Sequence, residues 1–514
     1  MKKQTFKTAF ALTLSLFMLV GCGFFCAAAT ADLSKNPDGS EPARLSGTVG
    51  ASNMNASAEA ATLSTPDTSV SKRDSSGEYD ASVATTLYPA DNLTISEAGI
   101  YILSGKYEGM ILIEAGEDEK VQLVLKNATL TNEDGPAIYI RSADKVFITA
   151  VEGTVNTISD GSAYSLIDDD TALDAAVFSR DDLTINGTGE LIINGNYKHA
   201  VVSKDDLIVT TKDLTVNAAN VGLNGKDSVK LSDTTVSITA GSDGIRSESG
   251  TDADKGFVSV MDSAITIVSG KDGIQAETSF IAENTAINIT TGSGSNTRST
   301  DTTESFKGIK AGISIIIDGG SYQINALDDA IHTNGSLRIS AGEFTLQSRD
   351  DGIHANGMIE ISDGTMDISA FEGIEATYIL ISGGDITIQA SDDGINGAHK
   401  SSQYTPTVEI TGGTVTVTMS AGDTDGIDSN GNVIITGGTV SVNGNSAFDY
   451  DGSVTFTGGT VYVNGQQVST LPNQMMGGRM GGFGGGRGEQ GSFGGHGWFG
   501  DQNGFGGFRG GNHP

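Results

Sequence analysis

Cysteine, proline and aromatic residues are scarce in this chain of 514 residues. The two cysteines, Cys22 and Cys26, both lie near the N-terminus, which excludes disulfides and cysteine-ligated metal sites from the rest of the chain. Proline occurs 8 times and aromatic residues make up 6%, whereas glycine occurs 70 times. No run has the spacing of a long amphipathic helix. Short alternating apolar runs bounded by Gly, Asp and Asn instead predict strands and turns.

Positive charge is also in deficit. The chain has 30 Lys and Arg against 64 Asp and Glu, a formal net charge of −34. A surface of this sign repels phosphate backbones, so nucleic acid is not expected as a partner. It favours cation binding or simple solubility instead.

Residues 1–31 have the pattern of a targeting segment, with a basic start followed by an apolar stretch over residues 10–20. The sequence Leu19-Val20-Gly21-Cys22 is similar to a bacterial lipobox, which predicts lipidation of Cys22 and a membrane anchor. The alternative is ordinary cleavage after Ala31. Either interpretation predicts an exported protein, as a cell-surface lipoprotein or in an extracellular form.

Composition divides the remainder into three parts. Residues 32–85 are rich in Ser, Ala and Thr and predict a flexible tether. Residues 86–470 alternate short strand patterns with turns and form the expected folded body. Residues 471–514 form a Gly-rich, low-complexity tail that we expect to be disordered.

A short motif, acidic–Gly–Ile, recurs through the folded body at intervals of about 22 residues, the sequence signature of a solenoid. Each interval contains about three strand-like runs, separated by glycine-containing corners. This pattern predicts an all-β parallel β-helix with three strands per coil. The copies begin at Asp243, Asp272, Asp351, Glu372, Asp393 and Asp425, with looser copies at Lys307 and Asp329.

Stacking the coils places the acidic residues in columns, since adjacent strands lie about 4.8 Å apart. Like charges at that spacing repel by roughly 3 kcal/mol at an effective dielectric of about 20. For a single Asp–Gly pair, a turn in which Asp bonds to nearby amides is the simpler interpretation. For the consecutive set, calcium fits best because it takes six to eight oxygen ligands. The predicted ligands are Asp328, Asp329, Asp350, Asp351, Glu372, Glu375, Asp392, Asp393, Asp425 and Asp428.

Two further columns are expected. His332 and His354 stack in adjacent coils, either as polar ladder positions or as ligands of a softer metal. In earlier coils, Arg180, Lys204 and Lys226 form a basic ladder beside aspartates. That ladder is either a self-neutralising surface network or a row of cations that contacts an anionic glycan.

The stretches at 176–187 and 202–207, with their recurring Ser-Arg/Lys-Asp-Asp-Leu block, resemble a bacterial family of secreted carbohydrate-binding domains. The later Asp-Asp-Gly-Ile copies are similar to it as well. The resemblance covers about residues 90 to 466 and implies a right-handed parallel β-helix that binds calcium and resembles pectate lyases. It also implies binding of plant cell-wall polysaccharide, both cellulose and polygalacturonate (pectin). The acidic residue is missing at Lys307-Gly308 and Ser446-Ala447, so calcium is not expected there.

The leading hypothesis is a monomeric, calcium-dependent protein that binds acidic or cellulosic glycans without being an enzyme. The first alternative is a pectate-type polysaccharide lyase, which needs a neutral base to remove a proton beside the uronate carboxyl. Lys271, Lys307 and Lys310 are the candidate bases. The second alternative is a structural adhesin in which calcium only stabilises the coils.

Overall fold

The computed structural model describes residues 63, 65–165, 172–252, 254–296, 303–422 and 424–473, all within one compact unit, Met1–Met475. The predicted targeting segment, the lipidation site Cys22, most of the predicted tether and the tail beyond residue 473 lie outside the described residues. Among the residues that are described, no helix has both the length and the apolar character needed to cross a bilayer.

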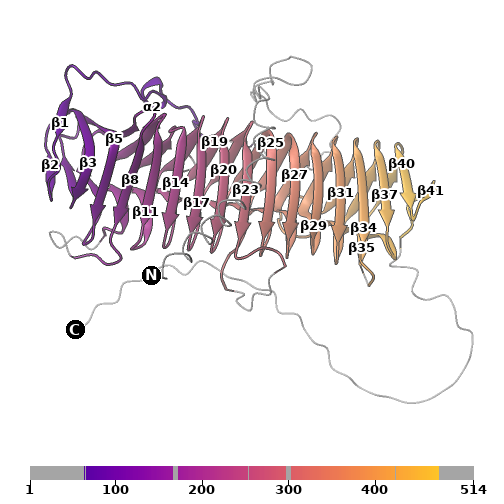
Figure 1. Ribbon diagram of the computed structural model, residues 1–514. Coiled ribbons are helices and arrows are strands. Elements are labelled where there is room, and N and C mark those ends of the chain that lie inside the picture. The colour runs from indigo at the N-terminus through magenta and orange to yellow at the C-terminus, as the bar shows by residue number, and fades with distance from the viewer. Residues whose placement is uncertain are drawn as a thin grey trace, which may run out of the picture. The chain divides into compact units, whose positions relative to one another are not determined.

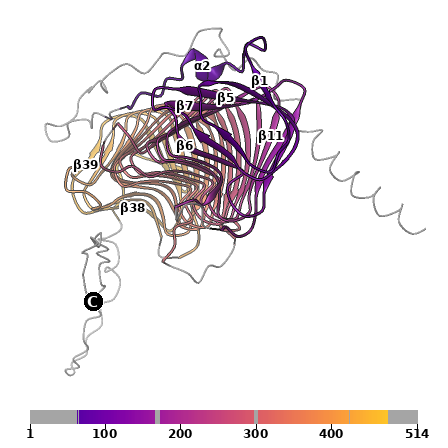
Figure 2. The ribbon, with the colours of Figure 1, turned by 90° about the vertical axis from the view of Figure 1, so that its left-hand side faces the viewer.

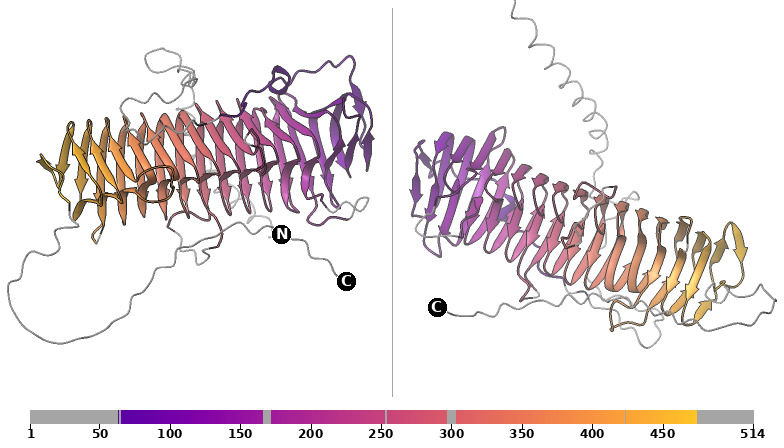
Figure 3. Two further views of the ribbon diagram at one scale, coloured as in Figure 1. Left: turned by 180° about the vertical axis from the view of Figure 1, so that it is seen from behind. Right: turned by 90° about the horizontal axis from the view of Figure 1, so that it is seen from below.

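The folded body is a stack of coils, each of which contributes strands to three faces (Figure 1). All strand pairings are parallel except that of β40 with β41, and each strand pairs with its counterparts one coil before and one coil after. Figure 3 shows the same parallel arrangement from behind and from below. The predicted all-β solenoid is therefore confirmed.

The first face carries the acidic–Gly–Ile copies and is called the motif face below. Its strands are β2 (Leu93–Ile95), β4 (Ile111–Glu114), β6 (Ile138–Ser142), β9 (Ala175–Ser179), β12 (His199–Ser203), β15 (Leu223–Gly225), β18 (Ile245–Ser247), β21 (Ile274–Ala276), β24 (Ile309–Ala311), β26 (Ile331–Thr333), β28 (Asp351–Ile361), β30 (Glu372–Ile381), β32 (Asp393–Gly397), β35 (Asp425–Ser429) and β38 (Ser446–Tyr450).

The second face continues from the C-terminal ends of these strands, and β28 and β30 run on into it. Its strands are β1 (Thr85–Leu87), β3 (Gly99–Glu108), β5 (Lys120–Asn132), β7 (Lys145–Ala150), β10 (Asp182–Gly187), β13 (Asp206–Val209), β16 (Ser228–Ser232), β19 (Phe257–Met261), β22 (Ser279–Glu283), β25 (Ser314–Ala326), β27 (Ser336–Ser348), β33 (Thr407–Ile410), β36 (Asn432–Ile435) and β39 (Val454–Phe456).

The third face returns the chain to the next coil, and β5, β25 and β27 extend into it. Its strands are β8 (Val155–Asp160), β11 (Glu190–Gly195), β14 (Asp213–Ala218), β17 (Thr235–Ala240), β20 (Ala264–Ser269), β23 (Ala286–Thr291), β29 (Thr365–Ala370), β31 (Asp385–Ala390), β34 (Thr414–Met419), β37 (Thr439–Asn443), β40 (Thr460–Val463) and β41 (Gln466–Val468).

The core is built by columns of identical side chains. Ile331, Ile353, Ile374, Ile395 and Ile427 are paired in register from coil to coil, and all are fully buried. These are the isoleucines of the repeated motif, so its periodicity is the periodicity of the core. Alternation along each strand directs these residues inward and their polar neighbours outward.

The glycine of the motif is required by close packing. A Cβ added at Gly352 would lie 2.3 Å from Cγ2 of Ile368 and 2.6 Å from the carbonyl oxygen of Gly373 in the next coil. Glycines at the corners have a different role, since Gly413 and Gly438 both have φ of +75°, which side chains rarely tolerate. The prediction of glycine corners is confirmed.

The predicted tether is partly wrong, because its last third packs on the solenoid. Within it, α2 (Lys72–Ser75) buries Asp74, which accepts a hydrogen bond of 2.6 Å from Thr184 Oγ1 on β10. Lys145 Nζ on β7 lies 2.8 Å from the same carboxylate, and the Arg73 guanidinium lies over the Phe147 ring. Figure 2 shows α2 outside the sheet of β5 and β7. The composition of the segment did not reveal this contact because one buried carboxylate and hydrogen bonds from Asn186 and Thr210 to the segment's backbone secure it.

We expect Asp74→Ala to release this segment. The substitution leaves the Lys145 ammonium, which is mostly buried, with only the longer contact of 3.7 Å to Asp182, and breaking such a pair costs about 3 kcal/mol. Amide hydrogen exchange in residues 65–84 should then accelerate by roughly 100-fold. Asp67→Ala, an exposed position in the same segment, is the control and should change nothing. Unchanged exchange in Asp74→Ala would show that Asp74 does not hold the segment.

Candidate functional site

The predicted acidic columns form where the coils enter the motif face. Asp351 is in register with Glu372, and Asp393 with Asp425. A third column includes the predicted histidine pair and runs through His332, His354, Glu375, Asn396, Asp428 and Asp449, each paired with the next. We call the ten predicted calcium ligands, in this stacked arrangement, the acidic edge.

The acidic edge contains four sets of side chains whose ligand atoms lie within 4.8 Å of one another. The first consists of Asp328, Asp329 and Asp350. Two contain a histidine and share His354. The last consists of Glu372, Asp392 and Asp393. Asp425 and Asp428 lie one coil further on, so eight of the ten predicted ligands fall into these sets.

A lysine already occupies the first set. Lys307 Nζ lies 2.6 Å from Asp329 Oδ2 and 3.0 Å from Asp328 Oδ1. Burial opposes the charge of Lys307, but the carboxylates of Asp329 and Asp328 outweigh it and raise the pKa of the ammonium above its ordinary value. The chain therefore supplies its own cation where calcium was predicted for Asp328 and Asp329.

The set of Glu372, Asp392 and Asp393 has no such partner. In the described part of the chain, no ion pair joins these residues, Asp425 or Asp428 to a lysine, arginine or histidine. Burial, and then the carboxylates of Asp428 and Glu372, raise the pKa of Asp393 to about 8. Burial and Glu375 raise the pKa of Glu372 to about 7. The Asn396 amide and the more distant Lys400 offset only part of the repulsion, so these carboxylates stay without a cation of their own.

An amide oxygen beside this set lacks a partner. Asn396 is buried, and its Nδ2 donates to Glu372 Oε2 at 3.0 Å, while its Oδ1 accepts no hydrogen bond among the described residues. Asn396 stands in register between Glu375 and Asp428. A buried, unpartnered carbonyl oxygen among carboxylates is a suitable ligand for a hard cation. Asn396 was not among the predicted ligands, although its place in the third column marked it.

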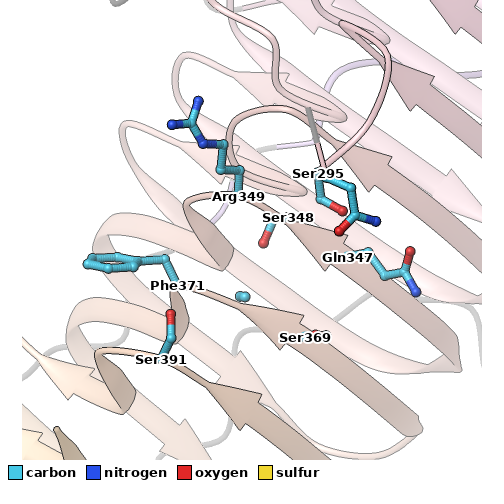
Figure 4. A pocket seen from close by; sticks show the side chains of 9 residues that line it. Ser295, Gln347, Ser348, Arg349, Ser369, Phe371 and Ser391 are labelled. Atoms are coloured by element: carbon cyan, nitrogen blue, oxygen red, sulfur yellow. The ribbon is translucent and has the colours of Figure 1, made fainter. Parts of the chain in front are cut away.

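A pocket of about 400 Å³ lies beside the acidic edge (Figure 4). Arg349, Phe371 and Ser391 of this pocket directly precede Asp350, Glu372 and Asp392 in the chain. Phe371 is 42% exposed, which is unusual for so large an apolar side chain. The sequence did not predict this pocket, because its walls come from different coils. They are Ser295, Asn296, Gln347, Ser348, Arg349, Ser369, Ala370, Phe371 and Ser391.

The predicted basic ladder lies at another corner of the coils. Arg180, Lys204 and Lys226 directly follow Ser179, Ser203 and Gly225, which are paired in register. Arg180 Nε donates to the Tyr139 hydroxyl at 3.1 Å, and Lys204 Nζ lies 5.7 Å from the Phe178 ring centroid. Lys226 Nζ is 3.9 Å from Asp227 Oδ1. The ladder follows the C-terminal ends of β9, β12 and β15, whereas the acidic edge lies before or within the first four residues of its strands, so the two are separate surfaces.

The three candidate bases are all paired with carboxylates, which corrects their assignment as neutral bases. Lys307 is held by Asp328 and Asp329 as described. Lys271 is paired with Glu304, whose hydrogen bond raises the pKa of the ammonium. Lys310 Nζ lies 3.5 Å from Asp272 Oδ2. A raised pKa keeps an ammonium protonated, so neither Lys271 nor Lys307 is poised to accept a proton near neutral pH.

The carboxylates that lack a cationic partner predict an unusual pH dependence for the metal-free protein. Asp393, Glu372 and Asp428 have pKa values of about 8, 7 and 6, above those of an unfolded chain. Their stabilising contribution is therefore complete below pH 4 and is lost as the pH rises through these values. In chelator, we expect the free energy of unfolding to fall by about 1–3 kcal/mol from pH 5 to pH 8. Thermal melting across this range measures it, and a melting temperature that does not fall contradicts it.

Comparison with known proteins agrees with the sequence resemblance. The family model described as carbohydrate-binding domain-containing protein matches residues 90–352 and 335–467. A carbohydrate-binding domain-containing protein of Acetivibrio thermocellus is 36% identical over 126 residues, which is 24% of this chain and 44% of that protein. The present chain thus matches less than half the length of this relative.

One solved structure, the gadolinium derivative of the polysaccharide lyase-like protein from C. thermocellum, is also similar. It has 28% sequence identity and a TM-score of 0.39, with 47% of this chain and 95% of that chain covered. The family model spans well over half of the present chain. The chain therefore belongs to the family of carbohydrate-binding domain-containing proteins.

Proposed function

We propose that this protein binds an acidic polysaccharide through calcium held at one end of the acidic edge. The proposed ligands are Glu372, Asp392, Asp393, Asn396, Asp425 and Asp428. The observation that carries the proposal is the combination of unpaired carboxylates with the unpartnered Asn396 oxygen. Oxygen-only ligands in flexible geometry suit calcium. The finer architecture proposed with it is a right-handed parallel β-helix, carried by an exported, lipid-anchored monomer.

A bound calcium ion would allow an acidic protein to bind an acidic polymer, because the ion contacts carboxylates of both. Calcium accepts six to eight oxygens, so an ion bound at an exposed corner keeps positions for a carboxylate of a uronic acid unit. The side chains of Glu372, Asp392 and Asp393 are all partly exposed, which leaves that side of the ion accessible. Without the ion, the two negative surfaces repel each other.

The adjoining pocket supplies the remaining contacts of a sugar-binding surface. Its serine hydroxyls and the amides of Asn296 and Gln347 match the hydroxyl groups of a glycan. The exposed Phe371 ring offers an apolar face for a sugar ring, and Arg349 offers a cation for a carboxylate (Figure 4). A cellulosic chain would use the hydroxyl and aromatic contacts but not the calcium.

Isothermal titration with polygalacturonate and with soluble cello-oligosaccharides tests the proposal. With calcium present, we expect polygalacturonate to bind, and excess chelator should abolish the binding. Binding that chelator leaves unchanged removes calcium from the mechanism. Stabilisation by calcium without affinity for either glycan would instead assign the ion a purely structural role.

A further inference from the structure

The middle of the acidic edge is chemically different from its ends, because two histidines enter it. His332 and His354 are in register in adjacent coils, and their rings stack with centroids 4.6 Å apart and planes at 11°. Each belongs to the same local sequence, acidic–Ala/Gly–Ile–His followed two residues later by asparagine. The repeat therefore places two imidazoles in identical settings, one coil apart.

The outer nitrogen of each ring is held by an asparagine. His332 Nε2 lies 3.1 Å from Asn334 Oδ1, and His354 Nε2 lies 3.1 Å from Asn356 Oδ1. An amide oxygen only accepts, so we assign the Nε2 proton to each ring on this contact. Metal-bound histidines are oriented in the same way, by a hydrogen bond from the nitrogen that does not bind the metal.

The inner nitrogen of each ring faces carboxylates. His332 Nδ1 lies 2.7 Å from Asp329 Oδ2. His354 Nδ1 lies 2.7 Å from Asp351 Oδ2 and 2.9 Å from Glu375 Oε2. An imidazole lone pair that faces carboxylate oxygens at these distances is repelled, so each Nδ1 either carries a proton that it donates or binds a metal ion.

The charge balance of the buried cluster leaves room for such an ion. Three carboxylates, Asp329, Asp351 and Glu375, are buried here. Two ammonium groups oppose them, with Lys307 on Asp329 and Lys400 Nζ 2.9 Å from Glu375 Oε2. Lys307 also pairs with Asp328 at 3.0 Å, so at least one negative charge remains unbalanced before the rings are counted. Either a proton on the His354 ring or a metal ion in its place can supply the missing positive charge.

We propose that His354, Asp351 and Glu375 bind a divalent transition-metal ion of the zinc class, with a fourth position open to water. The ligand atoms of these three residues lie within 4.8 Å of one another. The His332 ring stacks parallel to that of His354, so its Nδ1 lone pair does not converge on the same ion. Imidazole nitrogen with carboxylate oxygen favours zinc, nickel, cobalt or copper, whereas calcium takes oxygen ligands. On binding, the metal replaces the Nδ1 proton, which leaves to solvent. This site shares no ligand with the calcium proposed at Glu372, Asp392 and Asp393.

Titration of the calcium-loaded full chain with Zn²⁺ tests the assignment. We expect one zinc ion to bind, with proton release visible as a heat that depends on the ionisation enthalpy of the buffer. His354→Gln and Glu375→Gln should each weaken zinc binding by at least roughly 100-fold. His199→Gln is the matched control, because His199 is also buried but, among the described residues, is paired with a single carboxylate, Asp174, at 3.5 Å.

X-ray absorption at the zinc edge provides a readout that needs no variant. Scattering from imidazole in the first coordination sphere supports the site, and coordination by oxygen alone overturns it. A wild-type protein that binds no zinc, or a His354→Gln protein that binds it as tightly as wild type, also overturns it. Calcium titration of folded His354→Gln separates the two sites, since calcium affinity should not change.

Discussion

Asp393→Asn is expected to abolish calcium-dependent glycan binding and yet to stabilise the metal-free protein. Burial and the adjacent carboxylates hold the pKa of Asp393 at about 8, so its ionised form is unfavourable in the empty site. Neutral asparagine removes that repulsion, which should add about 1–2 kcal/mol in chelator at pH 8. With calcium, the lost ligand charge should weaken ion binding by at least about 100-fold. The effect on stability therefore changes sign with calcium.

Thermal melting in chelator and in calcium measures this reversal, and titration with polygalacturonate measures the loss of binding. Asp385→Asn is the control, because Asp385 begins β31 in the preceding turn of the chain and is exposed. It should alter neither quantity. If Asp393→Asn lowers the melting temperature equally in both solutions, the carboxylate has an ordinary structural role and the proposed calcium site is wrong.

Lys307→Gln is expected to cause the largest loss of stability at the acidic edge. The substitution leaves Asp329, which is buried, and Asp328 without their cation, and the loss of one partner of a buried pair costs about 3–5 kcal/mol. The vacated space is bordered by Asp328, Asp329 and Asp350, whose ligand atoms already lie close together. Added calcium should therefore recover part of the stability of the variant.

Amide exchange in β26 and β28, with and without calcium, measures both effects of Lys307→Gln. Lys226→Gln is the matched control, since Lys226 is exposed and its contact with Asp227 is 3.9 Å long. Removal of such a surface pair should cost less than about 1 kcal/mol. Exchange in Lys307→Gln that matches the wild type would show that the ammonium does not neutralise the first set.

The period of the solenoid and the position of the acidic columns followed from the sequence alone. A motif that returns once per coil must stack, because parallel pairing keeps equivalent residues in register. The isoleucine column from Ile331 to Ile427 and the glycine corners therefore needed no tertiary information. The family resemblance also needed no tertiary information, because short stretches such as the Ser-Arg/Lys-Asp-Asp-Leu block support it.

What only the tertiary structure decided is which carboxylates are already neutralised. The ammonium groups of Lys307 and Lys400 contact Asp329 and Glu375, which lie in other coils. No rule of sequence spacing predicts which carboxylate a long, flexible side chain will contact. The partner of Asp74 and the walls of the pocket at Phe371 are also brought together from distant parts of the chain. The period of the solenoid is a property of its repeated backbone. The charge balance of the acidic edge instead depends on individual lysine side chains that do not follow the repeat. Consequently the sequence located the acidic edge, and the structure divided it into a lysine-filled end, a histidine-containing middle and an unpaired end.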